Sequence, residues 1–491
     1  MNAGPGPRLA SSWHVREVSV LDASPSSSPP RSSGAARARR RVAILGGGFS
    51  GSALAIQLAR AGGLDVTLVE PNAVGPGVAY ATEPAHLLNV PAAKMSLFPD
   101  APDDFLTWAN AHGERATPTC FLPRAVYGAY VADTFARVAA PTIRVVHARV
   151  TSIEAVDGGA RWTIRLDDGR ALDADVVVLA TGNPAPADPT GLAAIVASPR
   201  YVSDPWRRGA LDAVAPEERI LLVGTGLTAL DVLVSLRERG HHGPIRALSR
   251  RGLLPQPHLV AGRLPAAAPV TIPLGASLEE MVRIVHIAAR GASARGQAWQ
   301  GVIDGLRGST SMLWASLSPV ERRRFLRHLR PYWEVHRHRA PESVLRHVGL
   351  LRASGALEVV AGRIVGASPS PAGVEVSVRR RHAADVEIAR YDRVVNTTGP
   401  DTDLARSGGP LIRGLLQRGL LLQDPDRLGL RTDATGAAIG ADGAAHASLY
   451  VLGQARRADL WEHTAVPDLS KGAAALATHL VATVAASATV G

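Results

Sequence analysis

Two glycine-rich segments carry the clearest chemical pattern in this sequence of 491 residues. Each follows an apolar strand and opens a helix with the spacing G-x-G-x-x-G/A, formed by Gly46, Gly48 and Gly51 in the first copy and by Gly224, Gly226 and Ala229 in the second. In this pattern the first glycine makes the turn, the second lets the backbone approach a pyrophosphate, and the third lets the helix pack closely on the strand. The helix N-terminus then points at the phosphates. Two such turns in one chain predict two dinucleotide sites and electron transfer between their nucleotides.

The two halves of the chain also end in the same way. An apolar strand at 175–180 leads into Thr181-Gly182, and a second at 391–396 leads into Thr397-Thr398-Gly399. β-type runs with hairpin signals precede both closing strands, at 143–150 and 161–166 in the first half and at 357–364 and 374–378 in the second. The same order of elements therefore occurs twice. We expect an α/β fold with two Rossmann-like dinucleotide-binding domains.

An acidic residue distinguishes the first site. Glu70 follows the strand 66–69 and lies 24 positions after Gly46. A carboxylate at this position can accept the hydroxyl groups of an adenosine ribose. The pattern favours FAD in the first site, and the alternative is a solvated carboxylate at a strand end.

The second site has arginines where the first has its acid. The strand 245–248 reaches Ser249, and Arg250 and Arg251 follow. A carboxylate here would repel a 2′-phosphate, whereas guanidinium groups can bind one. The pattern favours NADPH over NADH, and the alternative that both arginines only face solvent stays open.

A late strand at 449–452 leads into Gly453-Gln454. FAD enzymes of this architecture usually have Gly-Asp here, and the amide of Gln454 can replace the carboxylate as a hydrogen-bond partner. We expect a helix after Pro467, with its N-terminus near the flavin pyrimidine. This places the isoalloxazine ring near residues 453–464.

Further motifs extend over most of the chain. They are Gly77 to Tyr80, His86 to Pro91, Met95-Ser96, Phe98-Pro99, Asp103 to Trp108, Leu253 to His258, Tyr332-Trp333, His336 to Arg339, Leu460 to Glu462 and Thr464 to Pro467. With these motifs the sequence, from about residue 41 to its C-terminus, resembles the two-dinucleotide-binding-domain flavoproteins. Within that group it resembles the FAD-dependent urate hydroxylases and aspartate N-monooxygenases. The resemblance implies FAD in the first domain and NADH or NADPH in a second, inserted domain.

The duplicated pattern and the resemblance divide the chain into four predicted parts. We expect a disordered tail at 1–40, a first part of the FAD-binding domain at 41–200, an NAD(P)-binding domain at 201–400 with a helical insertion at about 276–351, and a return segment of the FAD-binding domain at 401–491. The tail is rich in Ser, Pro, Ala and Arg and cannot form a core. It is interpreted as an unstructured tail, a targeting sequence or the result of a start codon assigned too far upstream.

Composition excludes several classes of protein. Cys120 is the only cysteine, so electron transfer through an internal dithiol is excluded. The histidines form no metal-ligand pattern, and we expect no metal site. Residues 1–41 carry +5 of the net charge of +11, the remainder is only mildly basic, and no nucleic-acid-binding motif accompanies the charge, so we expect no nucleic-acid partner. We see no apolar run long enough for a membrane span and no secretory signal, which makes the cytoplasm the expected location.

Basic residues are almost all arginine. Only Lys94 and Lys471 are lysines among the 54 basic residues, a bias that we interpret as genomic composition. Arginines and tryptophans are frequent in the helical stretch 278–351. Within it we expect Trp333, Arg337 and Arg339 to line a site for an anionic substrate. The alternative for Arg337 is an ion pair with a nearby acid such as Glu334 or Glu342.

The predicted chemistry is that of the flavin. Glu462 and His463 are candidates for proton handling near it, and a structural role for Glu462 is the alternative. The resemblance implies a monooxygenase in which NAD(P)H reduces FAD, O2 forms a C4a-hydroperoxyflavin, and a small anionic, nitrogen-containing substrate such as urate or an amino acid is hydroxylated. Two alternatives remain: a reductase that passes electrons to a protein or quinone, and a flavin-binding protein without turnover. The sequence leaves the oligomeric state open.

Overall fold

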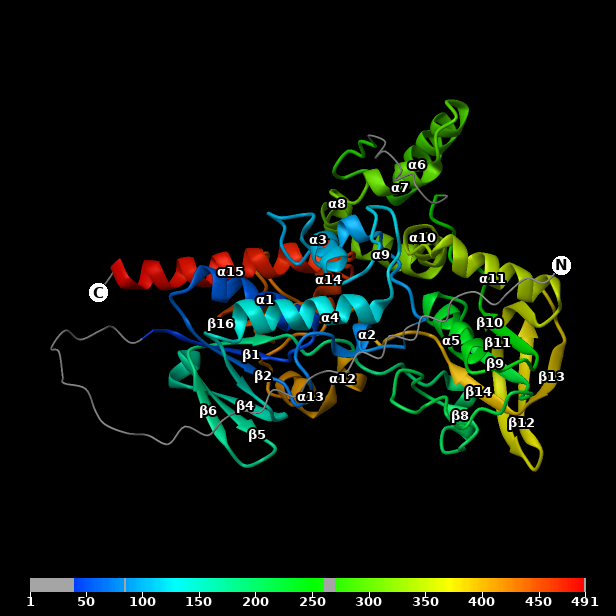
Figure 1. Cartoon of the computed structure of the whole chain (residues 1–491), viewed down its shortest axis with the longest axis horizontal. Helices are drawn as coiled ribbons and strands as arrows, with labels where there is room; N and C mark the ends of the chain where they lie inside the picture. Colours follow the sequence, from blue (N-terminus) through cyan, green and yellow to red (C-terminus); the bar gives the residue numbers. More distant parts are fainter. Residues whose placement is uncertain (1–38, 84, 260–269, 490–491) are drawn as a thin grey trace. The chain divides into compact units, whose positions relative to one another are not determined.

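The computed structural model describes residues 39–83, 85–259 and 270–489. The tail predicted at 1–40 lies outside the described residues apart from its last two. Two parallel sheets, each extended by antiparallel strands, organise the described chain, and a separate three-stranded meander accompanies the first (Figure 1).

The first sheet has the order β15-β16-β7-β1-β2-β3. Its strands are β1 (Arg41–Leu45), β2 (Asp65–Val69), β3 (Arg144–Val146), β7 (Val176–Leu179), β15 (Ala437–Ile439) and β16 (Ala445–Val451). All neighbours are parallel except β15 and β16. Val42 and Ile44 enter one core and Ala43 and Leu45 another, because the sheet is covered on both faces. This explains why its strands are apolar along their whole length.

Helices cover one face of the first sheet and a meander covers the other (Figure 1). The helical face contains α1 (Phe49–Ala61), α3 (Asp104–Ala111), α4 (Arg124–Thr134) and the long closing helix α15 (Val466–Thr489), with the short α2 (Gly77–Tyr80) beside them. The opposite face contains β4 (Val150–Val156), β5 (Arg161–Leu166), β6 (Ala171–Ala174), α12 (Leu404–Ser407) and α13 (Gly409–Gln417).

The second sheet has the order β13-β12-β11-β10-β9-β14-β8. Its strands are β8 (Tyr201–Val202), β9 (Ile220–Val223), β10 (Ile245–Ser249), β11 (Leu357–Ser370), β12 (Gly373–Arg380), β13 (Val386–Tyr391) and β14 (Arg393–Asn396). The strands from β11 to β8 are parallel, and β11 continues into an antiparallel meander with β12 and β13. Helices α5 (Leu227–Glu238) and α11 (Glu342–Ala353) pack on one face.

The two sheets repeat one arrangement. The order β7-β1-β2-β3 in the first corresponds to β14-β9-β10-β11 in the second, with the glycine-rich turn after β1 and after β9. This confirms the predicted α/β fold with two dinucleotide-binding sheets. Two details differ from expectation. The run 143–150 contains the whole of the short strand β3 and only the first residue of β4. The closing helix begins at Val466, with Pro467 in its first turn, where the missing N–H costs no helical hydrogen bond.

A helical layer is inserted before α11. It contains α6 (Leu278–Ala294), α7 (Trp299–Gly305), α8 (Thr310–Ser316), α9 (Pro319–Arg324) and α10 (Arg330–Arg337). Capping boxes at Ser277 and Ser318 start α6 and α9. The layer packs on α14 (Arg457–Leu460) and the residue after it, where Trp314 stacks on Trp461 with ring centres 4.7 Å apart. Thus a segment that interrupts the second repeat covers the return segment of the first.

None of the helices in the described part of the chain combines the length and apolar character that a bilayer crossing requires. Within the same residues no group of His, Cys, Asp and Glu is arranged to hold a metal ion.

Candidate functional site

The first glycine-rich turn, residues 46–51, uses two of its glycines for packing. Gly46 has φ +109°, and a Cβ there would lie 2.3 Å from the carbonyl oxygen of Ala180 at the end of β7. A Cβ at Gly51 would lie 1.8 Å from the carbonyl oxygen of Gly46. A side chain at either position would therefore separate the turn from the sheet or from α1.

Neither the backbone nor the packing at Gly48 requires a glycine. Its φ of −68° and ψ of −169° are open to any residue, and a Cβ would make only ordinary contact, 3.5 Å from the Cα of Gly77. Gly48 is also the N-cap of α1. Because it has no side chain, no side-chain cap occupies the N-terminal N–H groups of this helix. The exposed amides and free space at a helix N-terminus suit a pyrophosphate. The residues present therefore fit a dinucleotide.

The second turn, residues 224–229, has the same geometry. Gly224 has φ +127°, and a Cβ there would lie 2.5 Å from the carbonyl oxygen of Thr397. Gly226, the N-cap of α5, has φ −82° and nothing within 4 Å of a Cβ among the described residues. Ala229 is buried and provides the close helix–strand contact. The space beside Gly226 again fits a phosphate group.

Glu70 lies directly at the first turn. Its Oε2 accepts a hydrogen bond from the Gly47 amide at 2.7 Å, and its Oε1 accepts one from the Asn72 amide at 2.9 Å. Each carboxylate oxygen has a further lone pair, so Glu70 can still accept a ribose hydroxyl. Its ribose-binding role stays a prediction.

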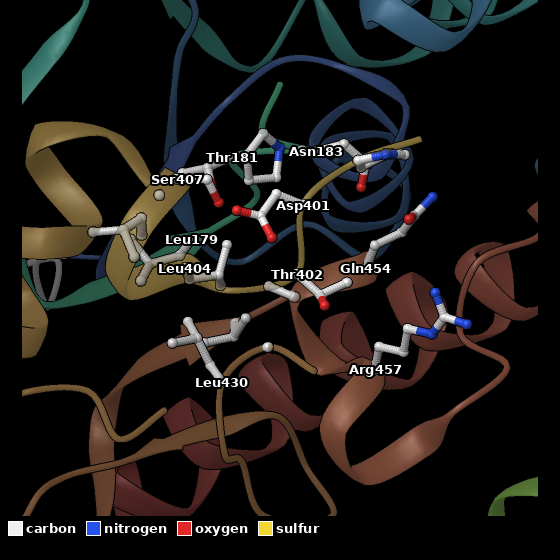
Figure 2. Close-up of a pocket in the computed structure, with 18 of the residues that line it drawn as sticks. Leu179, Thr181, Asn183, Asp401, Thr402, Leu404, Ser407, Leu430, Gln454 and Arg457 are labelled. Carbon is white, nitrogen blue, oxygen red and sulfur yellow. The ribbon is translucent and has the colours of Figure 1, made fainter. Parts of the chain in front are cut away.

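A cavity of about 250 Å³ opens at the carboxyl ends of β7 and β16. Figure 2 shows Asn183, Gln454 and Arg457 along one side and Leu179, Leu404 and Leu430 along the other. The predicted flavin residues Thr181, Gly182 and Gln454 line it, together with Asp401 and Thr402 after the second closing strand. Ligands of open α/β sheets bind outside the carboxyl ends of the strands, so the cavity lies where a cofactor is expected.

Two other predicted cofactor glycines lie at strand ends. Gly453 follows β16 with φ +97°, and a Cβ there would be 3.0 Å from Ser50 Oγ in the first turn. The return strand thus reaches the start of α1, beside the space at Gly48. Gly399 follows β14 with φ +83° and has open space around it among the described atoms.

Arg250 and Arg251 differ in the contacts that their side chains make. Arg251 donates to the carbonyl oxygen of His328 at 3.1 Å and lies over the ring of Tyr332, so its guanidinium is tied to the helical layer. Arg250 is exposed and has no hydrogen bond or ion pair with any described residue. Of the two arginines, Arg250 is therefore the one free to bind a phosphate.

Two of the predicted substrate residues, Trp333 and Arg337, contact the predicted proton-handling residue Glu462. Trp333 Nε1 donates to Glu462 Oε1 at 2.7 Å, and Arg337 Nε lies 2.9 Å from Glu462 Oε2. Both members of the ion pair are buried, with side-chain exposures of 8% and 7%. The alternative of an ion pair between Arg337 and an acid is confirmed, but the acid is Glu462; Glu334 and Glu342, the suggested examples, pair with Arg457 and Arg346.

His463 is buried beside this group. Its ring packs against the backbone of α15, where a Cβ on Gly472 would lie 2.7 Å from His463 Nε2. Burial, reinforced by the positive charge of Arg456, lowers the pKa of His463 to about 4. The imidazole is therefore neutral at physiological pH, and its Nε2 has no partner among the described residues.

A second group of charges lies beside it and was not predicted. Arg339 pairs with Asp304 at 2.5 Å, and Arg307 pairs with Asp468 in the first turn of α15 at 2.7 Å. Lys94 faces Asp304, Arg307, Arg339 and Arg337. The rarity of lysine in an arginine-rich sequence was the only signal that singled out Lys94.

A known protein family matches only the first part of the chain. Residues 43–184 match the family model described as FAD-NAD(P)-binding. No curated protein matches the chain.

Solved structures match almost the whole chain at low identity. Ornithine hydroxylase from Pseudomonas aeruginosa, in its reduced form, has a TM-score of 0.61 and 18% identity, with 90% of this chain and 99% of that chain covered. L-lysine 6-monooxygenase from Pseudomonas syringae has a TM-score of 0.62 and 18% identity over 90% and 99%. Ornithine N-hydroxylase from Kutzneria sp. 744 has a TM-score of 0.60 and 17% identity over 91% and 100%. The chain therefore shares the fold of these hydroxylases, with two dinucleotide-binding sheets.

Proposed function

We propose that this protein is an FAD-dependent NAD(P)H monooxygenase that hydroxylates a small, anionic, nitrogen-containing substrate such as urate or an amino acid. The observation that carries the proposal is the pair of glycines, Gly48 and Gly226, whose missing side chains no described contact explains. Each lies at a helix N-terminus and leaves room for a phosphate. Two nucleotide sites in one chain are what hydride transfer from NAD(P)H to FAD requires.

The residues divide between the two nucleotides. The N-terminus of α1 at Gly48, with Glu70, would hold the ADP half of FAD, and Gln454 would bind its ribityl chain. Gly226 and Arg250 would hold the pyrophosphate and the 2′-phosphate of NADPH. FAD, when bound, accepts hydride from NAD(P)H and passes electrons to O2 for oxygen transfer to the substrate.

Oxygen transfer to nitrogen is proposed by analogy with some of the structural neighbours, which also include a bacillithiol disulfide reductase with a TM-score of 0.54. The matched structures include an ornithine N-hydroxylase, and also a cadaverine monooxygenase bound to FAD, with a TM-score of 0.57. At sequence identities of 17% and 15% the similarity supports only a shared fold, so the reaction itself is our proposal. The single cysteine, Cys120, also argues against a dithiol reductase.

We assign different roles to the two candidate proton-handling residues. Glu462 is held by Trp333 and Arg337 and positions the helical layer over the return segment. His463 is neutral, and we keep it as the candidate for proton handling, as a weak base whose Nε2 is buried against α15. Its contact with α15 fixes the ring next to the helix whose N-terminus is expected at the flavin.

Substrate-dependent NAD(P)H oxidation tests the proposal. The purified flavoprotein is mixed with NADPH or NADH and with urate, aspartate, ornithine or a diamine, with and without O2. We expect O2-dependent stimulation by one of the substrates together with a hydroxylated product. Oxidation of NAD(P)H that needs an added quinone or protein instead of O2 would assign a reductase, and a bound flavin that NAD(P)H never reduces would leave only a flavin-binding protein.

A further inference from the structure

One side of helix α6 is exposed along most of its length. Leu278 and Met281 on the opposite side are buried with Trp314 and Trp461, and α7 packs beside the helix (Figure 1). The exposed side chains recur every three or four positions and therefore form one stripe along the helix. They are Glu279, Glu280, Arg283, His286, Ile287 and Arg290. We call these six residues the α6 face.

The start of α6 is fixed in the helical layer. Ser277 Oγ accepts from the Glu280 amide at 3.2 Å, and Glu280 Oε2 accepts from the Ser277 amide at 2.8 Å, which completes a capping box. The Leu278 amide donates to Glu321 Oε1 in α9 at 3.0 Å. The helix therefore presents the α6 face in one orientation, and a partner does not have to order it.

The charges of the α6 face are balanced. Two carboxylates, Glu279 and Glu280, accompany two guanidinium groups, Arg283 and Arg290. Glu280 is engaged in the capping box, whereas the other three form neither an ion pair nor a side-chain hydrogen bond with any described residue. A nucleic acid or an anionic membrane selects a uniformly basic surface, so neither fits this face. The face suits a partner that carries charges of both signs.

The two signs are separated along the helix. Glu279 and Glu280 lie in the first turn, and Arg290 lies 11 positions after Glu279, about 16 Å along the axis. A second α6 that lies antiparallel on this face would bring its Arg290 to these acids and its own acids to Arg290. Such a contact is twofold symmetric, so each pairing of opposite charges occurs twice. A parallel copy would instead place acids against acids.

Ile287 supplies an apolar contact in the same stripe. Its side chain is 61% exposed and lies between Arg283 and Arg290 along the helix. In the register that places Glu280 opposite Arg290 of the second copy, Ile287 lies opposite Arg283 of the second copy. The aliphatic stem of an arginine can cover such a side chain while its guanidinium group stays in water.

We propose that the α6 face binds the α6 face of a second copy of this chain in an antiparallel, twofold-symmetric contact. The acidic end of each helix then lies against the basic end of the other. A single pair of 17-residue helices buries less than the roughly 1,200–2,000 Å² of a stable interface, so the dimer is weak and depends on concentration. The proposal does not depend on the proposed function, because no residue of the α6 face is assigned to a nucleotide or substrate.

Charge reversal in the full-length protein tests the contact. Sedimentation equilibrium up to about 1 mM should show a reversible dimer of the wild type. Glu279→Arg and Arg290→Glu should each raise its dissociation constant about tenfold to a hundredfold, because each change places like charges together twice. An equimolar mixture of the two variants should dimerise like the wild type, since every facing pair is then opposite in sign. Arg352→Glu changes an exposed arginine of α11 and is the matched control, for which we expect the wild-type value.

The mixture separates a lost contact from a damaged fold, since a misfolded variant cannot be rescued by its counterpart. The circular dichroism spectrum of each variant provides a second check of folding. A wild type that stays monomeric would overturn the proposal and leave the face to another protein. The proposal would also be wrong if Glu279→Arg dimerised as tightly as the wild type, or if the mixture dimerised no better than its two components.

Discussion

The two glycine-rich turns share their backbone geometry and differ in what covers them. At the first turn the Gly75 amide donates to the carbonyl oxygen of Gly47 at 2.8 Å, Glu70 bonds Gly47, and Gly77 approaches Gly48. At the second turn Gly226 is exposed and has no described atom near the position of a Cβ. An enclosed turn suits a cofactor that stays bound, and an open turn suits one that enters and leaves. Under the proposed function, the first turn would hold resident FAD and the second exchangeable NAD(P)H.

The largest expected effects are losses of nucleotide binding, caused by one substitution in each glycine-rich turn. Gly48→Val should yield a protein without flavin, because a branched side chain would fill the space for the pyrophosphate although the backbone there accepts any residue. Gly226→Val should stay yellow and lose reduction by NADPH. The flavin absorbance per protein after purification and its bleaching by NADPH measure the two outcomes.

Gly349→Val is the matched control, since Gly349 lies in α11 with nothing within 4 Å of a Cβ among the described residues. It should keep both flavin and reduction. Full flavin content in Gly48→Val, or flavin loss in Gly226→Val, would contradict the assignment of the two turns.

The next effect is a loss of stability where the helical layer, which is inserted in the second repeat, packs on the return segment of the first repeat. Glu462→Ala should lower the free energy of unfolding by about 3–5 kcal/mol, because it leaves Arg337 buried without its carboxylate. Urea unfolding of the holoprotein measures it. Glu375→Ala removes an exposed carboxylate and should change the value by less than about 0.5 kcal/mol. A small effect in Glu462→Ala would mean that the layer is held by its apolar contacts alone.

A smaller effect should distinguish the nucleotides at the second turn. Arg250→Ala should raise the Michaelis constant for NADPH about tenfold to a hundredfold and change that for NADH little, since it removes a charge-assisted contact to the 2′-phosphate. Arg251→Ala should affect both nucleotides alike, because Arg251 donates to the carbonyl oxygen of His328 in the helical layer. Equal changes for NADPH and NADH in Arg250→Ala would show that this arginine does not read the phosphate.

The smallest effect is a pH dependence of stability. Folding lowers the pKa of His463 from 6.5 to about 4, so between these values the unfolded chain binds more protons and the folded state loses stability as the pH falls. The contribution approaches about 1.4 kcal/mol per pH unit. His463→Asn should give a shallower rise in the free energy of unfolding between about pH 5 and 6.5, above the range in which most carboxylates titrate. The exposed His382→Asn should keep the wild-type slope, and an unchanged slope in His463→Asn would count against a neutral, buried imidazole.

Local steric rules explain what the sequence predicted well. The positions of Gly46, Gly51 and Gly224 follow from close backbone approaches that only glycine allows, and strands such as 161–166 follow from their apolar alternation. The order of strands in both sheets then follows from repeating one pattern. These features depend on neighbours in sequence or on rules that hold for every sheet of this type.

Ion pairing could not be predicted in the same way. The acids close to Arg337 in sequence are Glu334 and Glu342, yet its partner is Glu462, which is 125 positions away. That pairing arises because the helical layer packs on the segment before α15, a contact that no local pattern encodes. The pairs Arg307–Asp468 and Arg339–Asp304 likewise join residues far apart in sequence that no local pattern relates.

Anaerobic reduction tests the central claim most directly. Wild-type protein as purified is mixed with NADPH in the absence of O2, and the visible absorbance of its flavin is followed. The two-nucleotide account predicts that the absorbance is bleached in the wild type, and that in Gly226→Val it persists at the same NADPH concentration. A colourless wild-type protein, or a flavin whose absorbance NADPH and NADH leave unchanged, would contradict the account.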